Sequence, residues 1–213
     1  HKPCADGPQA PQTECKLKRH TMFSAKTYAA RRNMLRTKIG SGIILLPGNS
    51  LSPNNYPNNA YYFRQDSSFR YYFGLNTPSL AGLIDADTGE EALYGDDFTV
   101  EDIIWTGPQP TLRELGAEVG VTATFPMAEL EKRLRKAVSL GRKIHYLPPY
   151  RGETKLQLSA LLGIKPELLH DYKSVDLMFA VAEMREVKSA EEVAQMEDAF
   201  HIGYAMHTTA MRM

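Results

Sequence analysis

The feature that most constrains this fold is an alternation of helix-type and strand-type hydrophobic patterns that begins near residue 22. Residues 41–49, SGIILLPGN, form a short continuous apolar run that ends at Pro47 and Gly48, as expected of a buried strand central in a sheet. Helix-type spacing follows in several later segments. The alternation predicts an α/β domain in which helices flank a mixed sheet.

The segment SLAGLIDADTGEEALYGDD, residues 79–97, predicts two short strands that meet at Asp87, Thr88 and Gly89. Asp-Thr-Gly is also the catalytic triplet of aspartic proteases, but the chain has no second copy. Asp85, Asp87 and Gly89 imitate the opening of a calcium loop whose closing ligands are missing. A hairpin turn is therefore the prediction.

Several segments begin and end with residues that are typical of helix termini. The first is an amphipathic helix with Ser24 as its N-cap and an end at Gly40. The residues that open the last helix, Ser189 to Glu192, form a capping box, and no stop signal follows before Met213. The remaining patterns are two helices at 111–120 and 125–141, a strand at 142–150 and a helix at 153–163.

Composition excludes several classes of function. The 213 residues carry 25 basic and 25 acidic side chains, so no basic field exists to bind nucleic acid or an anionic membrane. No apolar run approaches the ~18 residues of a membrane-spanning helix, and no signal peptide is visible. The expectation is a globular cytoplasmic protein without nucleic-acid or membrane partners.

Residues 1–21 differ in composition from the rest of the chain and contain both cysteines, Cys4 and Cys15. They are rich in Pro, Gln and charge, and they offer no matched Cys and His pair for zinc. We predict a tail that is disordered or artificially added, with no catalytic role.

Residues 61–75, YYFRQDSSFRYYFGL, place seven aromatic side chains around a polar centre. The pattern predicts a strand that ends near Phe63, then a short helix with Asp66 or Ser67 as N-cap and Gly74 as its stop. Arg64 and Asp66 need partners if the rings bury them. The residues alone leave open whether this segment is a site rim or a self-satisfied structural knot.

Four stretches, in this order, resemble the N-terminal domain of Xaa-Pro aminopeptidases, the aminopeptidase P family. They are YYFRQDSSFRYYFGLNTP (61–78), LIDADTGEEALYGDD (83–97), EDIIWTGPQP (101–110) and AEMREVKSAEEVAQM (182–196). The resemblance implies a ribonuclease-H-like creatinase/aminopeptidase P N-terminal domain at 22–181. It also implies that residues 182–213 are the linker and first helix of a truncated catalytic domain.

The same resemblance implies a function for the parent protein, which would remove an N-terminal residue that precedes proline. In the family, two divalent ions, expected to be manganese, are held by the C-terminal domain, so no metal or cofactor is expected here. This piece is expected to be inactive alone, to roof the active-site cleft and to form homo-oligomers. Its expected partners are peptides with proline second and its own catalytic domain.

The resemblance and local chemistry select Asn58, Arg64, Asp66 and Trp105 as candidate residues of the substrate-cleft rim. Trp105, the only tryptophan, would be read as core from residue type alone, whereas the matching family residue sits at the cleft mouth. Asn58 replaces the acidic residue that family members often carry near that point. No catalytic or metal-binding residue is predicted.

Three alternatives remain open. The chain could belong to a prolidase or creatinase relative, although FRQDSSF and IIWTG favour aminopeptidase P. It could belong to a catalytically dead, peptide-binding relative, or it could be a free-standing α/β interaction domain. The sequence does not reveal the residue preferred before proline, the metal, the oligomer size or the organism.

Overall fold

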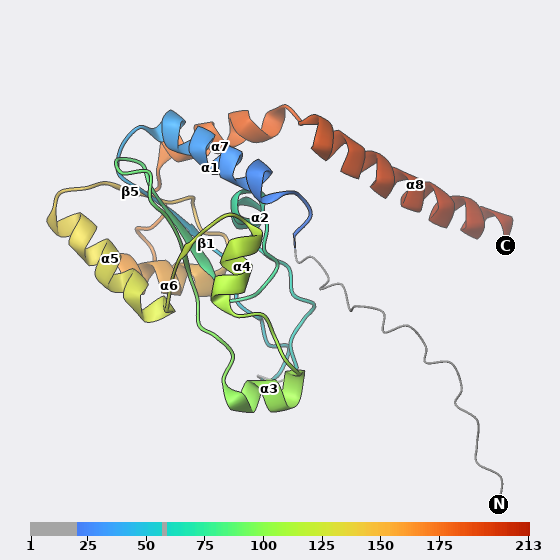
Figure 1. The fold of residues 1–213 in the computed structure, drawn as a ribbon, viewed down its shortest axis with the longest axis horizontal. Helices are drawn as coiled ribbons and strands as arrows, with labels where there is room; N and C mark the ends of the chain where they lie inside the picture. Colours follow the sequence, from blue (N-terminus) through green and yellow to red (C-terminus); the bar gives the residue numbers. More distant parts are fainter. Residues whose placement is uncertain (1–20, 57–58) are drawn as a thin grey trace, which may run out of the picture.

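The computed structural model describes residues 21–56 and 59–213, which build a five-stranded mixed sheet between layers of helices (Figure 1). The strand order is β4-β3-β2-β1-β5. The two inner pairs, β1/β2 and β2/β3, are antiparallel, whereas β1/β5 and β3/β4 are parallel. The predicted mixed sheet is confirmed, and its strands are β1 (Ile43–Pro47), β2 (Ala81–Asp85), β3 (Glu91–Tyr94), β4 (Ala123–Phe125) and β5 (Ile144–His145).

Eight helices accompany the sheet in the part of the chain that is described. Those predicted from capping signals begin and end as expected, with Ser24 and Ser189 as N-caps and Gly40, Gly74 and Gly163 as C-caps. The helices are α1 (Ala25–Ile39), α2 (Ser67–Phe73), α3 (Val100–Thr106), α4 (Leu112–Glu118), α5 (Met127–Ser139), α6 (Gly152–Leu162), α7 (Val175–Glu186) and α8 (Ala190–Arg212).

The central strands bury side chains on both faces of the sheet. Along β1, Ile43 and Leu45 face a cluster that includes Leu130 and Leu134 of α5, while Ile44 faces a cluster built with α1, α2, α4 and α7. Two-sided burial explains the continuous apolar run in this strand. In β2, a Cβ at Gly82 would lie 2.0 Å from the Phe73 ring, so only glycine lets α2 pack this close.

The predicted strand ending near Phe63 is wrong. Residues 61–66 belong to no strand, and the described residues just before them form an isolated bridge between Pro53 and Ala60. Tyr61 and Tyr62 are exposed, so no sheet surface exists to stabilise an extended aromatic segment here. The helix prediction for the same stretch is confirmed, with Asp66 as the N-cap of α2.

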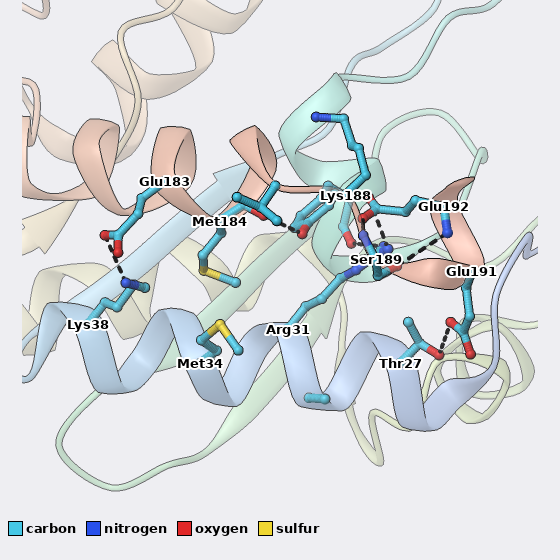
Figure 2. A pocket seen from close by; sticks show the side chains of 13 residues that line it. Thr27, Arg31, Met34, Lys38, Glu183, Met184, Lys188, Ser189, Glu191 and Glu192 are labelled. Atoms are coloured by element: carbon cyan, nitrogen blue, oxygen red, sulfur yellow. Dashed lines mark hydrogen bonds and ion pairs between the residues drawn. The ribbon is translucent and has the colours of Figure 1, made fainter. Parts of the chain in front are cut away.

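Helix α1 lies beside α7, and a salt bridge of 2.8 Å between Lys38 Nζ and Glu183 Oε2 joins them (Figure 2). The predicted domain boundary at residue 182 falls within α7, and the chain turns from α7 into α8 at residues 187–189. The division into 22–181 and 182–213 stays a prediction. The predicted tail, except Thr21, lies outside the described residues. Within the described part, no helix is both long and apolar enough to span a membrane.

Arg32 of α1 is completely buried and holds together three separate parts of the chain. Its Nε donates to Glu91 Oε2 of β3 at 2.7 Å, and its Nη1 and Nη2 donate to the carbonyls of Tyr72 and Val119, each at 3.0 Å. Burial lowers the pKa of the guanidinium, and the Glu91 carboxylate opposes that effect. No sequence pattern in this helix predicts a buried arginine.

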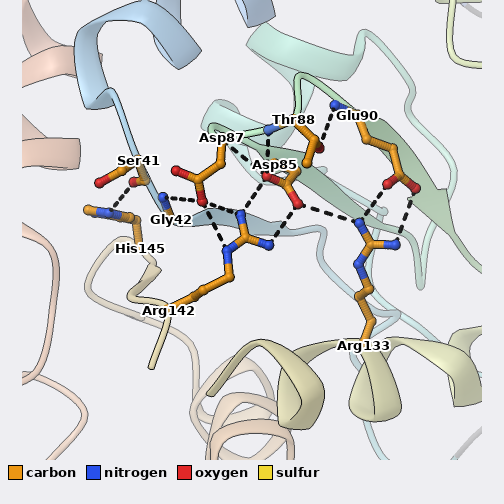
Figure 3. Close-up of polar contacts among 9 residues, drawn as sticks. All are labelled: Ser41, Gly42, Asp85, Asp87, Thr88, Glu90, Arg133, Arg142 and His145. Carbon is orange, nitrogen blue, oxygen red and sulfur yellow. Dashed lines mark hydrogen bonds and ion pairs between the residues drawn. The ribbon is translucent and has the colours of Figure 1, made fainter. Parts of the chain in front are cut away.

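The predicted hairpin turn between β2 and β3 is confirmed, and two arginines fasten it (Figure 3). Asp85, which is buried, accepts hydrogen bonds from the amides of Asp87 and Thr88 at 3.1 Å and from Arg142 Nη1 at 2.9 Å. Arg142 also pairs with Asp87, and Arg133 of α5 binds Glu90 through both of its terminal nitrogens. The carboxylates that imitate a calcium loop therefore bind arginines instead.

Acid is expected to weaken the interaction between Asp85 and Arg142. Burial alone would raise the pKa of Asp85, but hydrogen bonds from Arg142, Thr88 and Asp87, together with the charge of Arg142, outweigh it and lower the pKa to about 2. A lowered folded-state pKa stabilises the fold above the unfolded value and loses that contribution as the pH falls from about 4 to about 2. The contribution is about 2 kcal/mol.

Urea unfolding of wild type and Asp85→Asn at about pH 5 and about pH 2 measures this contribution. Wild type should lose about 2 kcal/mol more than the variant over that interval, because other carboxylates titrate in both proteins. Equal acid losses in the two proteins would show that Asp85 does not carry the effect.

Candidate substrate-cleft rim

Gln65 is the buried centre of the aromatic segment, with 3% of its surface exposed. Its Oε1 accepts hydrogen bonds from the amides of Asn49 at 2.6 Å and Asp66 at 2.9 Å, and its Nε2 donates to the carbonyl of Thr77 at 2.8 Å. The side chain of Asn49 donates to the Arg64 carbonyl at 2.9 Å. These bonds fix the backbone of residues 64–66 against the end of β1.

These hydrogen bonds show that Gln65 has a structural role, and a rim role for Arg64 and Asp66 stays a prediction. The sequence pattern points to Arg64 and Asp66 as the polar residues that need partners, whereas the structure places Gln65 at the centre. The available signal was its position between Arg64 and Asp66 in a stretch whose aromatic residues require buried polar partners.

Replacing Gln65 with leucine is expected to lower the free energy of unfolding by about 2 kcal/mol, because it leaves two amides and one carbonyl without their partner. Urea unfolding measures the change. The matched control is Gln109→Leu, since Gln109 is exposed and donates only to the nearby Thr106 carbonyl. Equal, small losses in the two variants would show that the network does not stabilise the segment.

Two of the predicted rim residues lie at the edge of this knot. The Arg64 side chain is exposed, while its backbone carbonyl is held by Asn49. Asp66 is half-buried, and its Oδ1 accepts hydrogen bonds from the amides of Ser68 and Phe69, each at 2.9 Å. Asp66 therefore serves as a helix cap, and a substrate contact would have to share its carboxylate.

An open pocket of about 470 Å³ lies next to Asp66. Its walls come from α2, α7 and the segment that follows β5, and they are largely apolar. Arg185 is the basic residue among those that line it. The lining residues are Asp66, Ser68, Leu147, Pro148, Tyr150, Met178, Val181, Ala182 and Arg185.

Trp105 lies on α3, a short capped helix that contains no buried residue. Thr99 and Asp102 form a reciprocal capping box that stabilises the helix locally. Trp105 is 83% exposed, and the preceding Ile104 is 75% exposed. A core role for Trp105 within the described chain is therefore excluded, and α3 lies at the opposite end of the body from α1 and α7 (Figure 1).

The structure does not join the predicted rim residues into one site. Across residues 21–56 and 59–213, no hydrogen bond or ring contact links Trp105 to Arg64 or Asp66. Asn58 lies outside the described residues. The rim assignment of all four residues stays a prediction.

His145 of β5 is a buried core residue. Its Nδ1 accepts from Ser174 Oγ at 2.6 Å, and its Nε2 donates to the Ser41 carbonyl at 3.1 Å. Burial, with the charge of Lys143, lowers its pKa. Since Ser174 is also buried and caps α7, the serine and histidine pair is structural rather than nucleophilic.

The described residues do not suit a divalent metal centre. Over these ranges, no group of three or more His, Cys, Asp or Glu side chains is placed to bind one ion. Asp85, Asp87 and Glu90 do lie together, but their carboxylates pair with arginines.

Comparison with known proteins identifies the class. Residues 28–146 match the sequence model of the family described as "Aminopeptidase P, N-terminal domain". The match covers more than half of the chain, which therefore belongs to the aminopeptidase P N-terminal domain family.

Two curated relatives are similar in sequence. A Xaa-Pro aminopeptidase of Escherichia coli is 27% identical over 199 residues, covering 89% of this chain and 45% of the relative. An uncharacterized peptidase of Saccharomyces cerevisiae is 22% identical over 177 residues, covering 83% of this chain and 32% of the relative. The chain thus spans less than half the length of either relative.

Solved structures share the fold. A histidine-to-alanine variant of Escherichia coli aminopeptidase P matches with a TM-score of 0.73, at 22% identity, over 89% of this chain and 45% of that one. Proline aminopeptidase P II of Yersinia pestis matches with a TM-score of 0.72 at the same identity and coverage. These matches confirm the predicted fold, a mixed sheet flanked by helices of the aminopeptidase P N-terminal type.

Proposed function

We propose that this chain is the non-catalytic N-terminal domain of a metal-dependent Xaa-Pro aminopeptidase, a peptidase that removes the residue preceding proline. The domain roofs the active-site cleft, restricts it to peptide N-termini and takes part in homo-oligomer formation. The observation that carries this proposal is the family match over residues 28–146. Its partners are peptides with proline in the second position and its own catalytic domain.

The exposed helix α3 supports the cleft role. A seven-residue helix that buries none of its own apolar residues is stabilised by its caps rather than by packing. Its exposed Val100, Ile104 and Trp105 form an apolar surface of the kind that marks binding sites. Trp105 is therefore proposed to contact substrate or a neighbouring subunit, with Arg64, Asp66 and Asn58 on the same rim.

Metal chemistry belongs to the proposed catalytic domain. One solved relative is a zinc-substituted Escherichia coli aminopeptidase P in complex with product, and another is a variant in complex with substrate. We infer two divalent ions, manganese in the native protein, bound outside the described residues. The proposed location of the protein is the cytoplasm.

Hydrolysis of Arg-Pro-Pro with added manganese tests the proposal, on this chain and on a version that continues into a catalytic domain. We expect release of arginine by the longer protein only, and no release from N-acetylated Arg-Pro-Pro. Activity in neither protein would favour a catalytically dead peptide-binding relative. Cleavage of Arg-Pro but not of Arg-Pro-Pro would favour a prolidase relative, and activity in this chain alone would contradict the proposal.

A further inference from the structure

Within the described part of the chain, the polar contacts of helix α8 with other elements lie near its start. None of its residues is buried, and it extends away from the body (Figure 1). Glu192, in the first turn, is its least exposed charged residue, with 16% of its side chain accessible. The direction of this long helix therefore depends on a few contacts near residues 187–192, which we call the elbow.

Arg31 of α1 lies directly beneath the elbow (Figure 2). It is 8% exposed, and its Nη1 donates to the Tyr71 carbonyl at 3.0 Å. The centre of its guanidinium lies 4.1 Å from the Tyr71 ring and 4.7 Å from the Phe23 ring. Stacking and hydrogen bonding thus hold the planar group in one orientation.

Glu192 links α8 to this fixed cation with one carboxylate oxygen and caps its own helix with the other. Its Oε2 accepts the amide of Ser189 at 2.8 Å, which completes the capping box. Its Oε1 lies 3.3 Å from Arg31 Nη2. That contact lacks hydrogen-bond geometry, since Nη2 has no hydrogen-bond partner, so charge attraction rather than a directional bond joins the two groups.

Other contacts secure the two sides of the elbow. The hydroxyl of Tyr71 donates to the Met184 carbonyl at 3.0 Å, which fixes the last turn of α7. Thr27 Oγ1 donates to Glu191 Oε2 at 2.9 Å, but this bond is exposed. Arg31 and Tyr71 stack on each other, so the residue that contacts α8 and the residue that contacts α7 hold each other in place.

Packing does not replace these polar contacts. A pocket of about 450 Å³ lies between α1 and the elbow, and Ala30, Met34, Met184 and Val187 are among the residues that line it. No residue of α8 belongs to either buried apolar cluster of the described chain, so apolar packing contributes little to the position of this helix. Three acidic and three basic side chains also line the pocket, so it does not favour a ligand of either charge.

We propose that Arg31 is a positioning residue: its ion pair with Glu192 sets the direction in which α8 leaves the domain. If the proposed function holds, α8 leads into the catalytic part, and Arg31 then orients the roof over the cleft. The inference about α8 itself is independent of that function, because it concerns contacts within this chain alone.

Distance measurement between two spin labels tests the proposal on the full 213-residue chain. One label is attached at Lys132→Cys on α5 and the other at Ala205→Cys on α8, both exposed positions, with Cys4 and Cys15 replaced by serine. Glu192→Gln is the central variant, because glutamine preserves the capping box but removes the charge. Arg31→Gln removes the other partner, and Lys38→Gln, which breaks an ion pair between α1 and α7, is the matched control.

We expect one narrow distance distribution in the unsubstituted protein and in Lys38→Gln. Glu192→Gln and Arg31→Gln should raise the population of other distances about tenfold, while circular dichroism shows unchanged helix content. A broad distribution in the unsubstituted protein, or a distribution unchanged by Glu192→Gln, would overturn the proposal. If Arg31→Gln fails to fold, Glu192→Gln still decides the result.

Discussion

Replacing Arg32 with methionine is expected to lower the free energy of unfolding by about 3 kcal/mol, which is a large effect for a single substitution. Methionine fills much of the same space, but it leaves the Glu91 carboxylate and the carbonyls of Tyr72 and Val119 without their donor. Urea unfolding of the two proteins at neutral pH measures the difference.

The chain contains a matched control for this experiment. Arg135 pairs with Glu131 at 2.6 Å on the outer side of α5, where 71% of the arginine and 46% of the glutamate side chain are accessible to water. Arg135→Met should therefore change the free energy of unfolding by less than about 0.5 kcal/mol. If the two variants lose similar amounts, burial does not distinguish the Arg32 contacts, and the explanation is wrong.

Replacing Trp105 with alanine in the longer protein is expected to lower kcat/KM for Xaa-Pro peptides of three or more residues by about tenfold. The expected change in stability is small, because Trp105 is exposed and α3 buries no side chain. Steady-state kinetics with Arg-Pro-Pro and a thermal unfolding curve measure the two quantities separately.

Leu156→Ala on α6 is the control, since Leu156 is also a large exposed apolar residue. It should leave both kcat/KM and stability near the wild-type values. Wild-type kinetics in Trp105→Ala would exclude a cleft role for this side chain. A large loss of stability would show that Trp105 is covered by structure in the longer protein.

Local signals in the sequence predicted much of the fold. Caps at Ser24, Asp66 and Ser189 mark helix starts that depend on hydrogen bonds within one turn, so no distant residue is needed to recognise them. The β2–β3 hairpin is also local, because Gly89 supplies the positive φ that the turn requires. Local hydrogen bonds and turn geometry therefore make these elements predictable from the sequence.

The predictions that the structure contradicts concern features that depend on residues distant in the sequence. The segment before Arg64 has aromatic residues typical of a strand, but no neighbouring strand reaches it. Val138 follows Leu130 and Leu134 at helical spacing, yet it is exposed, and Ala137 packs into the core in its place. Which side of a helix meets its neighbours depends on the neighbour as well as on the helix.

The two adjacent arginines of α1 were missed for the same reason. Arg32 is buried because β3 supplies a carboxylate and α2 supplies a carbonyl, and Arg31 is stacked because Tyr71 and Phe23 lie beside it. Nothing within α1 distinguishes them from exposed arginines. The four candidate rim residues were selected from the sequence. The structure describes three of them, and it shows no contact between Trp105 and either Arg64 or Asp66.

We propose that α3 lies at the mouth of a peptide cleft, and photo-crosslinking tests this placement most directly. A benzophenone amino acid replaces Ile104, which is exposed and leaves Trp105 in place, and a second protein carries it at Leu156 as the control. With the longer protein and a labelled Xaa-Pro peptide, we expect crosslinking at position 104 that unlabelled peptide competes away, and none at position 156. Absence of crosslinking at position 104 in an active enzyme would contradict the claim.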